Sequence, residues 1–191
     1  MSVAGLLLAA GAGRRRGGPK ALAHDPDGTS WLRRGLAVLR DGGCAEVTVV
    51  LGAGAEEARA VLGADPADVV VAEDWDEGMG ASLRTGLTAL GARAVDAPAA
   101  DAALVLLVDL PDVGADVVAR LVAAVDGPGA LARAAYDGEP GHPVVLGRDH
   151  WAGVVATARG DRGARDYLRA HPPVLVECGD LATGADVDGP V

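Results

Sequence analysis

Short apolar runs rich in valine alternate with longer amphipathic runs along most of the chain. We predict strands at the apolar runs, which are residues 3–10, 46–51, 68–72, 102–108, 131–136, 143–146 and 174–177. Apolar residues at helical spacing predict helices over residues 30–40, 79–90 and 113–125, and Ser30 is a suitable cap for the first of them. Parallel strands covered by helices on both faces produce this alternation. The pattern therefore predicts an α/β fold with a mostly parallel sheet.

One domain accounts for the whole chain. A length of 191 residues suits a single core, and no internal repeat or long linker divides the sequence. The regular alternation changes only after residues 126–129, where a Gly-Pro-Gly sequence precedes shorter and less regular elements. Ligands of open α/β sheets lie beyond the carboxyl ends of the strands, so the loops after the first, third and fourth strands are the places to search.

Composition excludes several classes of function. The formal net charge is -10, with 17 basic and 27 acidic residues, which disfavours a grip on nucleic-acid phosphates. Cys44 and Cys178 lie too far apart in sequence for a zinc motif or a disulfide framework. The apolar start at 3–10 is too short to cross a bilayer, and its arginines follow it. We predict a soluble, cytoplasmic protein that binds neither nucleic acid nor a membrane.

The loop after the first strand is rich in glycine and contains the only lysine of the chain, Lys20. A dinucleotide fingerprint would need glycine where Arg16 stands, and a Walker A loop would need a hydroxyl residue where Ala21 stands. What remains is a turn whose amides can face an anion, with Arg15 and Lys20 able to neutralise triphosphate oxygens. A basic surface turn is the alternative that the residues leave open.

The fourth predicted strand ends at Asp109, within the sequence Asp109-Leu110-Pro111. An aspartate in that place can hold Mg²⁺ against phosphate oxygens, because this cation prefers one or two carboxylates together with water and substrate. An isolated Asp-x-Pro is also common in turns. The four histidines show no paired metal-ligand spacing, and no Gly-x-Ser-x-Gly elbow occurs, so zinc chemistry and serine hydrolysis are disfavoured.

Six stretches of the sequence resemble one family, the MobA-like nucleotidyltransferases that finish molybdenum cofactor. Residues 8–20 are similar to its signature L-A-A-G-x-S-x-R-M-G-x-x-K, with Gly13 in place of serine and Arg16 in place of methionine. Residues 107–111 resemble its metal-binding strand end, and 186–190 resemble its D-I-D-T-P segment with Gly189 in place of threonine. The three remaining stretches point to one branch of the family.

That branch is the molybdenum cofactor cytidylyltransferases. Residues 75–83 resemble their W-x-E-G-M-G-x-S-L segment more closely than the guanylyltransferase equivalent, while 140–143 and 160–165 resemble their P-G-H-P and G-D-x-G-A-R segments. The resemblance implies a single three-layer, Rossmann-like domain over residues 1–191, similar to the nucleotide-diphospho-sugar transferases. In such a domain, about 1–126 bind the nucleotide, and about 127–191 bind the acceptor and supply a C-terminal metal ligand.

The resemblance also implies the reaction and its residues. CMP would pass from CTP to the phosphate of molybdenum cofactor with release of pyrophosphate, and Mg²⁺ would bind Asp109 and Asp188, with Asp186 as the substitute for the latter. Arg15, Lys20 and Asp109 would be catalytic. The nucleotide-binding residues would be Leu8, Ala9, Ala10, Gly11, Gly13, Gly78, Met79, Gly80 and Ser82, and the acceptor-binding residues Gly141, His142, Pro143, Arg162 and Arg165.

Two rival interpretations stay open at this point. One is an enzyme of the same architecture that uses GTP or serves another phosphorylated acceptor. The other is a catalytically silent relative that binds nucleotide or delivers cofactor to a client molybdoenzyme. Gly13, Arg16 and Gly189 depart from the family's motifs next to the expected phosphate and metal sites. These departures leave the second interpretation open.

Overall fold

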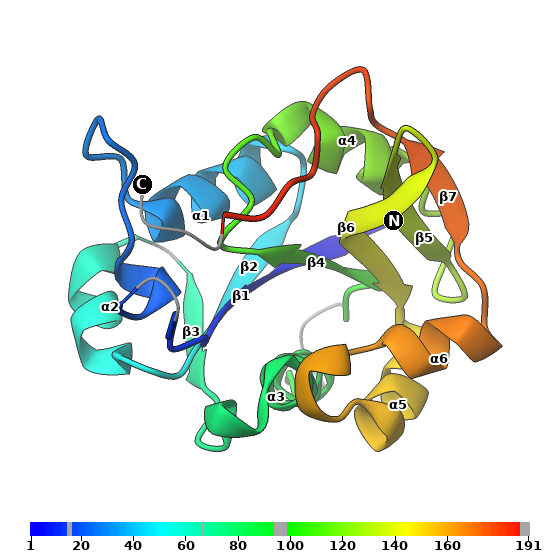
Figure 1. Cartoon of the computed structure of the whole chain (residues 1–191). Helices are drawn as coiled ribbons and strands as arrows, with labels where there is room; N and C mark the ends of the chain where they lie inside the picture. The colour runs from blue at the N-terminus through cyan, green and yellow to red at the C-terminus, as the bar shows by residue number, and fades with distance from the viewer. Residues whose placement is uncertain (15–16, 66, 94–98, 188–191) are drawn as a thin grey trace.

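The computed structural model describes residues 1–14, 17–65, 67–93 and 99–187, and in these residues one mixed sheet forms the centre of the molecule (Figure 1). Its strands lie in the order β3-β2-β1-β4-β6-β5-β7. Their bounds are β1 Val3–Ala9, β2 Glu46–Leu51, β3 Asp68–Val71, β4 Ala102–Leu107, β5 Leu131–Tyr136, β6 Glu139–Gly147 and β7 Val174–Glu177. The predicted strands are thereby confirmed, within a residue or two for all but the sixth.

Strands β1 to β4 are parallel neighbours, whereas β6 runs antiparallel to both β4 and β5. Strand β6 is longer than the predicted 143–146 because it forms a hairpin with β5. Asp137 and Gly138, with φ of 52° and 83°, make the turn, and the pair Tyr136 and Glu139 closes it. An Asp-Gly pair is a strong hairpin signal, since both central residues of such a turn adopt positive φ.

Helices cover both faces of the sheet and give three layers (Figure 1). One face carries α1 (Trp31–Asp41), α2 (Ala55–Leu62) and α4 (Ala115–Ala123), and the other carries α3 (Met79–Gly91), α5 (Arg148–Thr157) and α6 (Arg165–Ala170). The residues of β1 alternate between the two resulting cores: Leu7 packs in the first, and Leu6 and Leu8 in the second. The predicted three-layer α/β fold is confirmed.

Three helices had been predicted, and the structure contains all of them. Ser30 caps α1 by accepting a hydrogen bond from the Arg33 amide at 3.4 Å. Helices α2, α5 and α6 are absent from the sequence prediction because each buries too few apolar side chains to produce a helical pattern. Only Trp151 and Val154 are buried in α5, and only Leu168 in α6.

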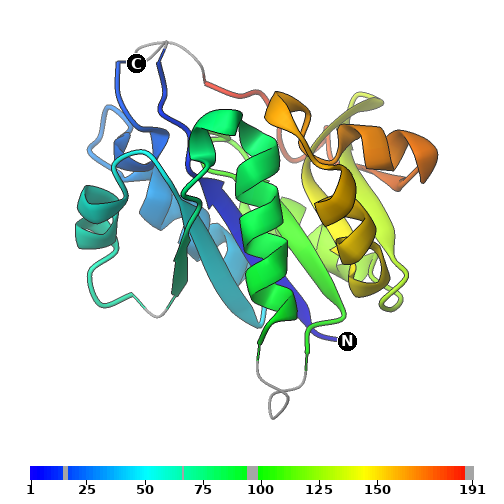
Figure 2. The ribbon, with the colours of Figure 1, turned by 90° about the horizontal axis from the view of Figure 1, so that it is seen from below.

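Several loops gather at the carboxyl ends of the parallel strands. Figure 2 shows the chain after β1, the start of α3 and the segment that leads into α6 at the same end of the sheet, opposite the N-terminus. Three short 3-10 helices shape this end: η1 (Lys20–Leu22), η2 (Trp75–Glu77) and η3 (Gly160–Arg162). Within the described residues, no helix is long and apolar enough to span a membrane.

We predict that Gly80→Ala destabilises the fold although alanine favours helices. A methyl group at Gly80 would lie 2.7–2.9 Å from backbone atoms of Arg159, so α3 and the segment before η3 would have to separate. The expected loss of unfolding free energy is about 1–3 kcal/mol. The matched control is Gly91→Ala in the same helix, where nothing lies within 4 Å. It should be neutral or stabilise by up to about 1 kcal/mol. Urea unfolding of both variants checks this, and equal effects would contradict the prediction.

Candidate functional site

A cavity of about 480 Å³ lies at the carboxyl ends of β1 and β4. Its walls come from the loop after β1, from η2 and the start of α3, from the end of β4, and from Asp161 in η3. The predicted site residues that line it are Leu8, Ala10, Gly11, Gly13, Lys20, Gly78, Met79, Ser82 and Asp109. Segments far apart in sequence therefore meet in one cavity, as the sequence analysis expected of the nucleotide site.

The glycine-rich loop folds back on itself and needs glycine at position 13. Gly13 has φ of +55°, and a side chain there would lie 2.0 Å from the carbonyl oxygen of Gly18. The Gly17 amide donates to the Gly13 carbonyl at 3.0 Å, and the Lys20 amide donates to the Gly11 carbonyl at 3.2 Å. Serine at position 13 would be strained in this conformation, so the departure from the signature has a local structural cause.

The folded loop places Lys20 against Asp109. The Lys20 ammonium donates a hydrogen bond to the Asp109 carboxylate and forms an ion pair with it. The side chain of Asp109 is 11% exposed and that of Lys20 is 20% exposed, so neither charge is fully hydrated. A poorly hydrated charge needs a partner of opposite sign. This pair joins the first loop to the end of the fourth strand at the wall of the cavity.

Asp109 offers carboxylate oxygens at the place where the sequence predicts Mg²⁺, and hard oxygen ligands are the ones that this cation prefers. A carboxylate that is almost buried and borders a cavity fits such a role. The described residues contain no cluster of three or more histidine, cysteine, aspartate or glutamate side chains that could hold a metal ion. The predicted second ligand, Asp188, lies outside the described residues, as does Arg15. Asp186 is described and is exposed.

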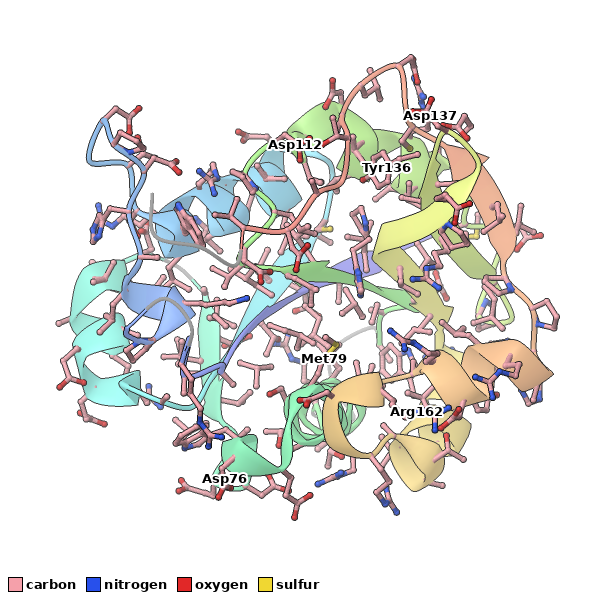
Figure 3. All side chains as sticks on the ribbon, viewed as in Figure 1. Asp76, Met79, Asp112, Tyr136, Asp137 and Arg162 are labelled. Atoms are coloured by element: carbon pink, nitrogen blue, oxygen red, sulfur yellow. The ribbon has the colours of Figure 1, made fainter. Side chains whose placement is uncertain are left out.

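Residues 179–187, which we call the C-terminal strap, are fixed to the body of the protein. Asp112 accepts hydrogen bonds from the amide and the hydroxyl of Thr183 at 2.7 and 2.5 Å. Gly184 packs on the ring of Tyr136, where a side chain would lie 2.1 Å from the ring. The Val187 amide then donates to the Asp109 carbonyl at 3.1 Å. Figure 3 shows Asp112 and Tyr136 beside the strap, which thus ends next to Asp109.

On the other side of the cavity, glycine allows α3 to lie close to η3. Gly78 has φ of +111°, and a side chain there would lie 2.4 Å from the Asp161 carboxylate. Arg84, which the sequence analysis missed, strengthens this seam. It donates to Asp74 at 2.6 Å, to Glu77 at 2.7 Å and to the Ala158 carbonyl at 3.0 Å. Arg84 therefore ties the segment around η2 to the segment before η3.

A second pocket of about 70 Å³ adjoins the cavity, and the two share Leu8, Met79 and Asp161 as walls. In Figure 3, Met79 lies between Asp76 on the η2 side and Arg162 on the α6 side. The second pocket is lined by Leu8, Met79, Leu83, Val105, Arg133, His142, Val144, Leu146, Asp161, Arg162, Ala164, Arg165 and Leu168. Three of the predicted acceptor-binding residues, His142, Arg162 and Arg165, thus lie together.

His142 is held in an environment that keeps it uncharged. The Tyr136 hydroxyl donates to the His142 carbonyl at 2.6 Å, and Arg133 donates to the Gly141 carbonyl at 2.7 Å. Burial, assisted by the positive charge of Arg133, lowers the pKa of His142 from its usual 6.5 to about 4. The imidazole is therefore neutral at pH 7.

Four predicted site residues lie near the site without lining either pocket. Ala9 is buried in the core between the sheet and α1, and Gly80 packs against the backbone of Arg159. Gly141 and Pro143 form the strand that presents His142, and neither is part of the pocket wall. These four residues support the site by packing and by forming its strands and helix.

Arg84 and Arg133 escaped the sequence analysis because neither belongs to a recognised motif. Each is fixed by a backbone carbonyl far away in the chain or across a hairpin, namely Ala158 for Arg84 and Gly141 for Arg133. A single sequence contains no signal for a bond of that kind. The one available hint for Arg133 was its position in a strand made otherwise of alanine, leucine and tyrosine.

An open, mainly parallel sheet with a glycine-rich loop after β1 and a cavity at the carboxyl ends of its strands defines an α/β protein of the nucleotide-binding type. Residues 5–174 match the MobA-like NTP transferase domain, and the chain belongs to this family. It is thus a nucleotidyltransferase by family, and the resemblance to the MobA-like family is confirmed.

Individual relatives extend this result. Nicotine blue oxidoreductase of Paenarthrobacter nicotinovorans is 39% identical over 196 residues, which cover 97% of this chain and 92% of that protein. Rv0371c from Mycobacterium tuberculosis H37Rv has a similar structure, with a TM-score of 0.78 and 29% identity over 99% of this chain and 94% of that one.

Two further solved structures resemble this one. Rv0371c in complex with manganese gives a TM-score of 0.74 at 27% identity, covering 98% of this chain and 94% of that one. The nucleotidyl transferase Mth528 from Methanothermobacter has a TM-score of 0.80 at 20% identity, over 98% of this chain and 92% of that one, which shows the shared fold.

We predict that His142 makes the fold less stable in acid. The pKa of His142 is about 4 in the folded protein and near 6.5 in the unfolded chain, so only the unfolded chain gains this proton as the pH falls from 6.5 to 4. Stability conferred by the neutral imidazole is complete above pH 6.5 and declines below it, by about 3 kcal/mol in total. Comparing the unfolding free energies of wild type and His142→Gln at pH 7 and pH 4 isolates this effect. Parallel losses in the two proteins would refute it.

Proposed function

We propose that this protein transfers CMP from CTP to the phosphate of molybdenum cofactor and releases pyrophosphate. The observation that carries the proposal is the meeting of Lys20 and Asp109 in one cavity with the glycine-rich loop. A cation, a buried carboxylate and a turn with exposed amides are the groups that bind a triphosphate and its metal ion. The choice of CTP and of the pterin acceptor comes from the resemblance of residues 75–83, 140–143 and 160–165 to the cytidylyltransferases.

The residues of the cavity divide the work between donor and metal. The loop from Ala10 to Gly13 and the ammonium of Lys20 bind triphosphate oxygens, and Lys20 exchanges Asp109 for these oxygens as the donor enters. Asp109 and Asp188 would hold Mg²⁺, which spreads the charge that develops on the donor phosphates. The hydrogen bond from Val187 to Asp109 supports Asp188 as the second ligand, because the described chain reaches Asp109 one residue before it.

No protein nucleophile or general base is required. A phosphate monoester is ionised at neutral pH, so positioning and charge neutralisation carry most of the rate enhancement in phosphoryl transfer. The neutral His142 is suited to a hydrogen bond with the acceptor. Met79 and Asp161 border both pockets, so the phosphate of an acceptor in the small pocket and a donor in the large cavity would meet at these residues.

A divalent cation is also supported by a relative. The structure of Rv0371c, 27% identical to this chain, is a complex with manganese. We propose Mg²⁺ as the ion for this protein because carboxylate and phosphate oxygens are its usual ligands.

The 39% identity to nicotine blue oxidoreductase favours a second candidate, a redox enzyme that acts on an organic pigment or a related ring system. A catalytically silent protein that delivers cofactor to a client molybdoenzyme is a third. The three differ in what they consume: the transferase consumes a nucleoside triphosphate, the oxidoreductase consumes a reductant, and the delivery protein consumes neither.

We predict that Asp109→Asn abolishes nucleotidyl transfer with the fold intact. Loss of the metal-binding carboxylate should lower kcat/KM at least about a hundredfold, which corresponds to about 3 kcal/mol of transition-state stabilisation. Asp101→Asn is the matched control, because Asp101 precedes the same strand at its opposite end and accepts a hydrogen bond from the Ser2 amide. Pyrophosphate release from CTP in the presence of molybdenum cofactor and Mg²⁺ is the assay. Wild-type turnover by Asp109→Asn would exclude the metal assignment.

We predict that the protein prefers CTP and that its reaction requires a divalent cation. Pyrophosphate release should be at least about fivefold faster with CTP than with GTP, ATP or UTP, since one lost hydrogen bond to the base is worth at least about 1 kcal/mol. Addition of EDTA should stop the reaction, and Mg²⁺ should restore it. A parallel measurement of NADH and NADPH oxidation with nicotine blue tests the redox candidate. Pigment reduction without triphosphate turnover would overturn the proposed function, and CTP binding without either reaction would favour the delivery protein.

A further inference from the structure

The small pocket contains two arginine side chains without acidic partners. Arg133 extends from β5 and Arg165 begins α6, and both line the pocket beside His142. Among the described residues, the one hydrogen bond of the Arg133 guanidinium goes to the Gly141 carbonyl, and no carboxylate forms an ion pair with Arg133 or Arg165. These two charges are therefore uncompensated within the described structure.

Two neighbouring arginines, in contrast, have an acidic partner. Arg162 donates to Asp166 at 2.5 Å, and Arg169 lies 3.5 Å from the same carboxylate. The chain as a whole has a formal charge of -10, so acidic side chains are abundant. A protein of this composition could neutralise the pocket with an acidic residue on an adjacent element. Asp161 is the one acidic residue among the pocket walls, and it forms no ion pair with either guanidinium.

The surroundings raise the energetic cost of the Arg133 charge. The other walls of the pocket are mostly aliphatic, formed by Leu83, Val105, Val144, Leu146 and Leu168 among others. Burial, and then the charge of Arg165, lower the pKa of Arg133. Charges interact more strongly in such an environment than in water, so an anion that enters gains more from the half-buried Arg133 guanidinium than it would at the surface, and the exposed Arg165 adds a second, better hydrated charge.

We propose that Arg133 and Arg165 form an oxyanion-binding subsite that anchors the acceptor through a compact anionic group. The inference rests on the proposed function in one respect, which is that the occupant of the subsite is the acceptor. A volume of about 70 Å³ suits one phosphate or carboxylate group and excludes a ring system. Two guanidinium groups can each donate to different oxygens of one oxyanion, and the neutral imidazole of His142 can add a further hydrogen bond.

The subsite adjoins the large cavity. Lys20 and Asp109 line the large cavity and are not among the walls of the small pocket, but the two spaces share Leu8, Met79 and Asp161. An oxyanion held by Arg133 and Arg165 thus lies beside the large cavity, as the acceptor phosphate of the proposed reaction must. Arg133 takes the place that the sequence analysis gave to Arg162, whose charge is already neutralised by Asp166.

The test uses inorganic phosphate as the probe and the imidazole signals of the full chain as the readout, without nucleotide or metal. Saturating phosphate should shift the His142 signal and raise the pKa of His142, because the anion offsets the positive charge of Arg133. Arg133, Arg165, Arg162 and Asp161 are the charged groups that share this pocket with His142. The signals of His24, His150 and His171 should not move.

Substitutions then assign the effect. Arg165→Gln should weaken phosphate binding roughly tenfold or more, as expected for loss of a charge-assisted hydrogen bond. This exposed side chain can be replaced without disturbing the core. Arg133→Gln should do the same, with Arg133→Lys as a charge-retaining variant if the first does not fold. Arg169→Gln, on the same helix as Arg165, is the matched control and should bind phosphate as wild type does.

The outcomes separate the subsite from the proposed function. A His142 signal that ignores phosphate, or wild-type affinity in Arg165→Gln and Arg133→Gln, overturns the subsite. A phosphate response that persists in Lys20→Met places the anion in the small pocket, and one that vanishes places it in the donor cavity and overturns the proposal. An acetate titration distinguishes a carboxylate from a phosphate as the preferred group. If the phosphate response is present but no triphosphate is consumed, the subsite stands and the transferase assignment fails.

Discussion

The ion pair between Lys20 and Asp109 is the interaction on which the arrangement of the site depends. It connects the glycine-rich loop after β1 to the end of β4, two elements that are brought together by the parallel pairing of Leu8 with Leu107. Neither side chain is fully hydrated, so separating them would leave two poorly solvated charges. The sheet supplies the proximity, and the opposite charges fix the loop against the strand end.

A second constraint comes from the packing of α3 on η3. Gly78 and Gly80 permit a close approach that any larger residue would prevent, and Arg84 spans the same seam with hydrogen bonds to both sides. The large cavity and the small pocket are therefore both built on this junction. Part of the segment 75–83, which resembles a nucleotide-binding motif, thus serves packing. Gly80 contacts protein backbone and does not line the cavity.

The sequence was sufficient for the central sheet, for the three helices that bury the most side chains and for most of the residues that line the large cavity. Buried strands and helices with several buried side chains leave a strong period in the chain, and residues 8–20 follow a recognisable signature. Helices α2, α5 and α6 were not predicted because they bury few side chains. Arg84 and Arg133 were missed for another reason. Their partners are carbonyl groups, which every residue has, so no pattern of side chains could reveal them.

The path of the C-terminal strap has a practical consequence for handling the protein. The strap runs from β7 past Asp112 and Tyr136 to Asp109, so an affinity tag or reporter fused at the C-terminus would follow the segment that contacts Asp109. Met1, in contrast, is 77% exposed and lies at the other end of the sheet (Figure 2). Purification handles and immobilising linkers therefore belong at the N-terminus, away from Asp109.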